Sequence, residues 1–194
     1  MSVRSALRTL EHLLLAIAVV CLSWYGWRMY SIDRAEERLN SEVNRTLAAV
    51  KQPRDWTRTL PRGRPANGLI GKIEIPRLNL SAPIKTADDP SVLDFSVGYL
   101  PDTPLPWMPG NSALASHRDR LFRPLRFIRK GDTIKLSTTH GVLNYRVMKT
   151  MIVNPEDVWV LKPLPKVNLT LITCYPFYFV GHAPHRFIVQ AEKL

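Results

Sequence analysis

A cysteine and an arginine occupy the ends of two apolar segments late in the chain. Cys174 ends the first, residues 167–174, and Arg186 stands near the start of the second, residues 185–191. Side chains alternate between two faces along the first segment, as in a β-strand, and Pro176 then ends it because proline has no N–H to donate. A residue at a strand end meets both a rigid scaffold and solvent. If the two strands pair, the thiol and the guanidinium become neighbours.

A lone thiol needs a base or a positive neighbour to act as a nucleophile, since its ordinary pKa of about 8.5 leaves it mostly protonated. His117 has the best context, because the short run of small residues 111–116 reads as a strand that delivers it at its end. His140 stands in a turn signal and is expected to be exposed. His182 and His185, in the loop after the cysteine, could line a site or be solvated. Spacing alone does not decide among these histidines.

The N-terminal part predicts a membrane anchor. Residues 13–27 are uncharged and mostly apolar, and extension of the run to Tyr30 makes it just long enough to span a bilayer. Large aromatic residues stand where a cleaved signal peptide needs small ones, which favours an uncleaved anchor. Arg4 and Arg8 precede the run, so we expect a single-pass protein with its N-terminus in the cytoplasm and its main domain outside.

The net charge and the two cysteines indicate which binding partners and which compartment suit the main domain. An exported domain rarely meets nucleic acid, so the formal net charge of +11 favours contact with lipid headgroups or envelope polymers, or a solvated basic linker. Cys21 lies inside the predicted span and cannot pair with Cys174. Cys174 is therefore a single thiol in an oxidising compartment, which is unusual unless the thiol is used.

The rest of the chain divides into three parts. Residues 1–30 form the tail and anchor, residues 31–67 a helical stalk followed by a linker rich in proline and arginine, and residues 68–194 the main domain. Short alternating segments and turn residues make that domain all-β, either a sandwich or a barrel. Residues 89–94 read as a single helical turn, and the proline-rich stretch 101–111 as a long ordered loop on the surface.

Several segments, in this order along the chain, resemble the sortases, the membrane-anchored cysteine transpeptidases of bacterial surfaces, and most closely the class D type. The resemblance covers roughly residues 68–194 and implies a closed eight-stranded β-barrel with short helices. The segments that carry it are Ala115-Ser116-His117-Arg118-Asp119, Leu121-Phe122-Arg123-Pro124-Leu125, Thr170-Leu171-Ile172-Thr173-Cys174-Tyr175-Pro176-Phe177 and Gly181-His182-Ala183-Pro184-His185-Arg186.

The resemblance also implies a chemistry. It assigns the nucleophile to Cys174, the catalytic histidine to His117 and an oxyanion-stabilising or substrate-holding arginine to Arg186. The implied substrate is a C-terminal sorting signal of the Leu-Pro-X-Thr-Gly (LPXTG) kind, cleaved between Thr and Gly through a thioester. The protein is then transferred to an amine on a peptidoglycan precursor or a pilin lysine. Sortases of this type usually have glycine directly before the histidine, whereas this chain has Ser116, and serine does not easily reach all the backbone angles open to glycine.

An apolar loop before the cysteine strand is the candidate contact for the Leu-Pro part of such a signal, although it could instead be a hydrophobic cluster that plugs the barrel. The candidate substrate-binding residues are Val158, Trp159, Val160, Leu161 and Thr173. No metal or cofactor is expected, because the adjacent Asp88 and Asp89 resemble solvated turn residues. Asp119 could orient the ring of His117 only if the strand continues past it.

Two other hypotheses about the function are compatible with the sequence. The first is another exported Cys-His hydrolase or an L,D-transpeptidase, which would not need an arginine on the strand after the cysteine. The second is a β-domain without enzyme activity that binds an envelope polymer and keeps Cys174 as an inert core thiol. Replacement of Cys174 by alanine would leave the function of such a binding domain intact.

Overall fold

The computed structural model describes residues 11–28, 30, 34, 41, 45, 68–87, 90–163, 166–179 and 181–194. Residues 11–28 form a helix whose large apolar side chains are exposed. Nowhere in the described part of the chain does a helix combine the length and the apolar character needed to cross a membrane. The predicted stalk and linker, residues 31–67, lie outside the described residues apart from 34, 41 and 45.

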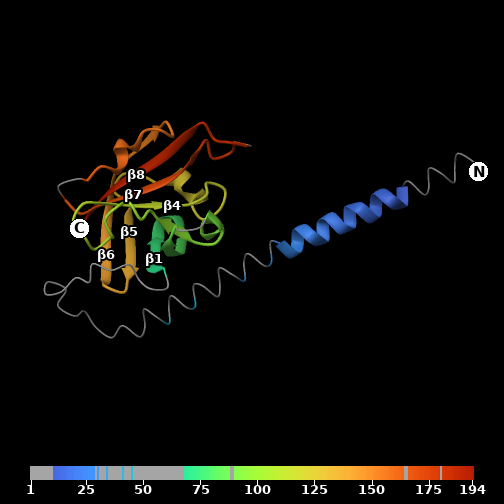
Figure 1. Ribbon diagram of the computed structural model, residues 1–194, viewed down its shortest axis with the longest axis horizontal. Helices are drawn as coiled ribbons and strands as arrows, with labels where there is room; N and C mark the ends of the chain where they lie inside the picture. Colours follow the sequence, from blue (N-terminus) through green and yellow to red (C-terminus); the bar gives the residue numbers. More distant parts are fainter. Residues whose placement is uncertain are drawn as a thin grey trace, which may run out of the picture. The chain divides into compact units, whose positions relative to one another are not determined.

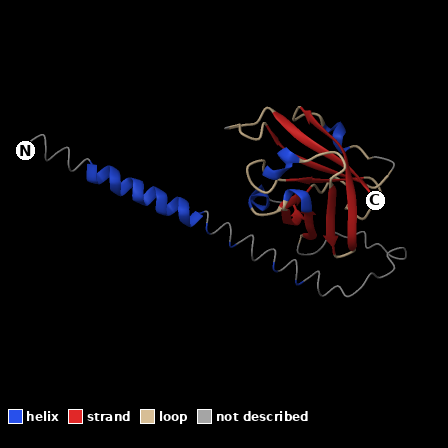
Figure 2. Cartoon of the chain, turned by 180° about the vertical axis from the view of Figure 1, so that it is seen from behind, coloured by secondary structure: helices blue, strands red, loops and turns tan. Residues whose placement is uncertain are grey.

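In residues 68–194, the described strands close into one eight-stranded barrel, as the sortase resemblance implies and in place of the sandwich alternative. Figure 1 labels six of these strands, and Figure 2 shows short helices in the connections between them. The order around the barrel is β1-β2-β3-β4-β7-β8-β6-β5. The strands are β1 (Leu69–Ile75), β2 (Leu80–Thr86), β3 (Val97–Tyr99), β4 (Asn111–Ala115), β5 (Thr133–Thr138), β6 (Gly141–Val153), β7 (Asn168–Tyr175) and β8 (His185–Lys193).

The strand ends follow from local sequence. Strand β1 ends at Ile75 because Pro76 begins a 3-10 helix, η1 (Pro76–Leu78). Asn79 then takes a left-handed backbone conformation, with a φ of 50°, and starts the return along β2. The other described 3-10 helices are η2 (Pro90–Asp94), η3 (Arg123–Phe127) and η4 (Val158–Leu161). Helix η2 confirms the helical turn predicted over residues 89–94.

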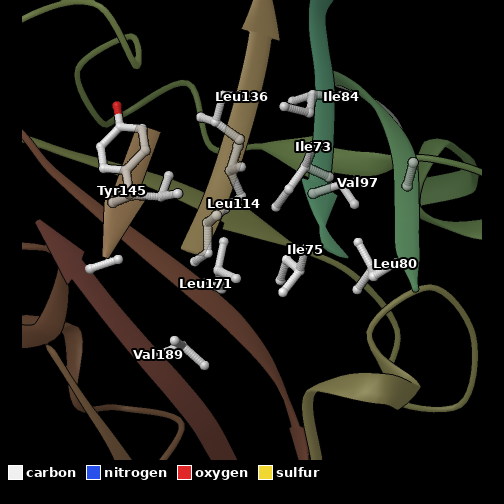
Figure 3. Close-up of a cluster of buried hydrophobic side chains, with 14 of the residues drawn as sticks. Ile73, Ile75, Leu80, Ile84, Val97, Leu114, Leu136, Tyr145, Leu171 and Val189 are labelled. Atoms are coloured by element: carbon white, nitrogen blue, oxygen red, sulfur yellow. The ribbon is translucent and has the colours of Figure 1, made fainter. Parts of the chain in front are cut away.

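One side chain in two along each strand points into a single apolar core. Leu114 from β4, Leu171 from β7 and Val189 from β8 belong to this buried cluster, and Figure 3 labels them together with side chains from other strands. All three are fully buried. Burial of a Leu or Val side chain contributes about 1.5–3 kcal/mol, so a one-residue slip of any of these strands would expose several such side chains.

The proline-rich loop between β3 and β4 is ordered, as predicted, but its expected position on the surface is wrong. Leu105 and Trp107 are each only 7% exposed and belong to the core cluster. The hydroxyl of Tyr145 in β6 donates to the carbonyl of Pro106 at 2.8 Å. Burial raises the pKa of Tyr145, which keeps the phenol a neutral donor. The loop is thus held in place by its buried apolar side chains and by this hydrogen bond.

Candidate active site

The pairing of β7 with β8 brings the cysteine and the arginine together. These strands are antiparallel, and Cys174 lies directly opposite Arg186 in their register. Opposite residues of an antiparallel pair have Cα atoms about 4.5–5.5 Å apart and side chains on the same face of the sheet. The expectation that these two residues become neighbours is therefore confirmed.

The pairing of β7 with β4 brings in the histidine from the other side. These strands are parallel, with Ala115 opposite Ile172. The match continues past the end of β4, because the Ser116 N–H donates to the Ile172 carbonyl at 3.3 Å. The Thr173 hydroxyl then donates to the Ser116 carbonyl at 2.8 Å. His117 is the next residue of the chain, so it follows β4 at the same end of the sheet at which Cys174 stands in β7.

Cys174 and Arg186 belong to the outer face of the barrel wall. Residues 114, 171 and 189 point inward in Figure 3, and side chains alternate along a strand. Cys174 is three positions after Leu171, and Arg186 is three positions before Val189, so both point outward. His117 follows two residues after the end of β4, and its side chain is 44% exposed. The thiol and the guanidinium thus share the outer face, and the imidazole is exposed beyond the end of the neighbouring strand.

Arg186 is held by backbone oxygens near its own strand start. Its Nη1 donates to the carbonyl of Ala183 at 3.3 Å and to that of His185 at 3.1 Å. The guanidinium carries further N–H donors in a fixed plane. Cys174 itself is partly exposed, so a substrate can reach the sulfur. The ends of these neighbouring strands thus carry a thiol, an imidazole and a guanidinium.

A carboxylate that the sequence pattern did not single out lies beside His117. Asp94, the last residue of η2, has its Oδ1 3.9 Å from Nε2 of His117. Arg120 contacts the same carboxylate oxygen through Nη2 at 3.8 Å, and its Nη1 donates to the Asp94 carbonyl at 3.1 Å. Asp119, the carboxylate considered from sequence, is exposed. The helical-turn pattern located Asp94 at the end of an element, but nothing in the pattern connected it to His117.

The connection between β6 and β7 covers the same outer face further along the strands. The side-chain amide of Asn111 donates to the carbonyl of Val160 at 2.9 Å, and that of Gln190 donates to the same oxygen at 3.4 Å. Val160 is buried by this contact, whereas Val158 and Trp159 are 67% and 48% exposed, and Leu161 is half-buried. Helix η4 therefore presents apolar side chains outside the barrel.

Thr173, the fifth candidate for substrate binding, has a different environment. It is buried on the inner face, opposite Phe187, and its hydroxyl is engaged by the Ser116 carbonyl. Its contact in the structure is thus with the residue that precedes His117.

The other histidines lie elsewhere. His140 is not simply exposed, as its turn position suggested, because its ring stacks on Trp107 with centroids 4.0 Å apart. Burial in this stack lowers the pKa of His140. His182 is exposed, and His185 starts β8 opposite Tyr175. Across the described residues, no group of three His, Cys, Asp or Glu side chains is placed to hold a metal ion, and Asp88 and Asp89 are outside those residues.

Ser116 adopts an ordinary backbone conformation. Among the described residues other than glycine, only Asn79 has a positive φ. The position before His117 therefore does not require glycine in this chain. Ser116 is 5% exposed, and its buried Oγ has no hydrogen-bond partner among the described residues.

Comparison with known proteins identifies the class to which this barrel and this site belong. The family model described as "Sortase domain" matches residues 73–194. This chain belongs to the sortase family, whose members are cysteine transpeptidases that join proteins carrying a sorting signal to amine acceptors.

Individual relatives agree. The chain is 29% identical to Sortase D of Bacillus subtilis over 93% of its own length and 96% of that protein. Among solved structures, sortase C of Clostridium perfringens is 28% identical with a TM-score of 0.59, over 84% of this chain and 90% of that one. A Clostridium perfringens Sortase D5 transpeptidase shares the fold, with a TM-score of 0.64 and 22% identity over 84% of this chain and 99% of that one.

The environment of Ser116 predicts how the site tolerates substitution there. Ser116→Ala removes a buried hydroxyl that lacks a partner, so we expect the free energy of unfolding to stay unchanged or to rise by up to about 1 kcal/mol. Ser116→Gly should lower it by roughly 0.5–1 kcal/mol, because glycine loses more backbone entropy on folding. Thermal or urea unfolding measures both. The rate of transpeptidation should not increase in either variant. A several-fold gain in Ser116→Gly would contradict the conclusion that the position before His117 does not require glycine.

Proposed function

We propose that this protein is a membrane-anchored sortase that cleaves an LPXTG-like C-terminal sorting signal between Thr and Gly. It transfers the protein through a thioester on Cys174 to an amine, carried by a peptidoglycan precursor or a pilin lysine. The observation that supports the proposal is the strand register, in which Cys174 of β7 lies opposite Arg186 of β8 and β4, which precedes His117, pairs with β7 on its other side. Neither a free cofactor nor a metal enters this chemistry.

In the first half-reaction, the thiolate of Cys174 attacks the carbonyl carbon of the signal's threonine. A carbon–sulfur bond forms, and the carbonyl electron pair moves to oxygen. Arg186 donates hydrogen bonds to that oxyanion or to the substrate backbone next to it. The imidazolium of His117 gives its proton to the glycine nitrogen as the carbon–nitrogen bond breaks, and the thioester remains.

In the second half-reaction, the acceptor amine attacks the thioester carbonyl. His117, now neutral, takes the proton from the amine, and the carbon–sulfur bond breaks to restore the thiolate. Water competes as a slower acceptor. The partial exposure of Cys174 gives a second substrate access to the sulfur.

The apolar part of the signal packs against η4. Val158 and Trp159 are the exposed apolar side chains of this helix, and the hydrogen bonds of Val160 hold it on the outer face that also carries Cys174. The leucine and proline of a signal would cover this surface and leave the threonine near the sulfur. Val160 and Leu161 support the helix from below, and Thr173 acts through the position of Ser116.

The acyl-enzyme is the direct test of the transpeptidase. The purified full chain is incubated with an LPXTG peptide library and an amine acceptor, and intact-protein mass spectrometry follows the adduct. We expect a thioester on Cys174 that is absent in Cys174→Ala. His117→Ala should slow turnover by about a hundredfold or more, as for other proton-transfer groups, and Arg186→Gln by roughly 10²–10³-fold if it serves the oxyanion.

The matched control is the reaction of Cys174 with a small alkylating reagent. A folded protein whose thiol is alkylated but never acylated by any peptide would refute the assigned substrate class. Unchanged biological function in Cys174→Ala would instead support the binding domain without enzyme activity. Hydrolysis in the absence of any transfer to amines would favour the hydrolase alternative.

Membrane anchoring rests on the N-terminal sequence. The apolar run over residues 13–27, the exposed apolar side chains of the helix at 11–28 and the preceding Arg4 and Arg8 support a single-pass anchor with an external catalytic domain. The full chain should stay with membranes after an alkaline wash, and a chain without residues 1–30 should not. On intact cells, an impermeant thiol reagent should label Cys174, and recovery of the full chain in the wash would contradict the anchor.

A further inference from the structure

The contact between Asp94 and His117 lies where the segment before β3 meets the segment after β4, because these two strands are antiparallel neighbours in the barrel. Asp94 ends η2, in the connection from β2 to β3, whereas His117 follows β4. The contact uses Nε2 of the imidazole, at 3.9 Å from Oδ1. The side chains are 44% and 41% exposed, so the pair lies at the open surface of the site.

The carboxylate of Asp94 is itself held in place. Arg120, in the loop after His117, contacts Oδ1 at 3.8 Å and donates to the backbone carbonyl of the same aspartate at 3.1 Å. The segment after Asp94 is fixed too, because Ser96 donates from both its N–H and its hydroxyl to the Val92 carbonyl. Leu93 packs close to Gly98 of β3, where a Cβ would approach its Cδ2 to 2.5 Å. Arg120 and the packed residues that flank Asp94 in the chain therefore hold this aspartate in place.

Charge makes this contact relevant to the proposed chemistry. The acylation step needs His117 as an imidazolium, and the site already carries the positive charges of Arg186 and Arg120. The carboxylate of Asp94 puts a negative charge on the Nε2 side of the ring, and Arg120 holds that carboxylate in place.

We propose that Asp94 is a positioning residue for His117, held in turn by Arg120, and that it aids proton transfer without touching the substrate. The inference rests on the proposed transpeptidase function. It assigns a role to a carboxylate that lies far from the histidine in sequence, in place of the adjacent Asp119.

The test measures steady-state transpeptidation by the full chain with an LPXTG peptide and an amine acceptor, for the wild type, Asp94→Asn and Asp94→Glu. Because the pair is partly exposed, we expect kcat of Asp94→Asn to fall by about three- to tenfold, the size expected for an ion pair at the surface. KM for the peptide should stay within about twofold, since Asp94 does not contact the substrate. Asp94→Glu should recover part of kcat, because it restores the carboxylate.

Asp119→Asn is the matched control, because it removes an exposed carboxylate that is close to His117 in sequence. The kcat of this variant should remain within about twofold of the wild type. Thermal unfolding checks that every variant is folded. Wild-type kcat in Asp94→Asn, a change in KM alone, or an equal loss in Asp94→Glu and Asp94→Asn would each overturn the positioning role. A wild-type protein that forms no acyl-enzyme would overturn the proposed function, and this role with it.

Discussion

The structure depends on the position of β7 between a parallel and an antiparallel neighbour. A parallel partner ends where β7 ends, so β4 delivers its following residues, and with them His117, to the C-terminal end of β7. An antiparallel partner begins where β7 ends, so β8 starts at the same edge with Arg186. Cys174 stands at that end of β7. The three groups meet because one strand pairs in opposite senses on its two sides.

The buried core keeps this meeting point in register. Leu114, Leu171 and Val189 are buried in one cluster inside the barrel, and the inward direction of these residues sets the outward direction of their neighbours along each strand. A slip of one residue between β7 and β8 would turn Cys174 inward and place an apolar side chain in water. The hydrogen bond from Thr173 to the Ser116 carbonyl adds a local lock just before His117. The positions of the site residues at the surface are therefore fixed by the packing of the core beneath them.

Local sequence patterns predicted some of this arrangement and could not have predicted the rest. Alternation and Pro176 located the end of β7, and the neighbouring positions of Cys174 and Arg186 followed from two successive strands. The parallel pairing of β4 with β7 is a long-range contact that periodicity does not encode, so the resemblance to sortases was needed to single out His117. Asp94 was missed for the same reason. The burial of Trp107 was missed because proline spacing shows that a loop is rigid and not which way its side chains point.

A cross-linking measurement tests the alignment of the three strand ends without relying on activity. In a Cys21→Ser background, His117→Cys and Arg186→Cys each add a second thiol that the proposed alignment puts next to Cys174, and a disulfide accepts Cα separations of about 4.4–6.8 Å. Mild oxidation should form an intramolecular disulfide in both variants, seen as the loss of two hydrogen atoms in the intact mass and of both free thiols. Asp119→Cys serves as the distance control and should remain reduced. Failure of both variants to cross-link, or equally fast cross-linking of the control, would contradict the register on which the active site is built.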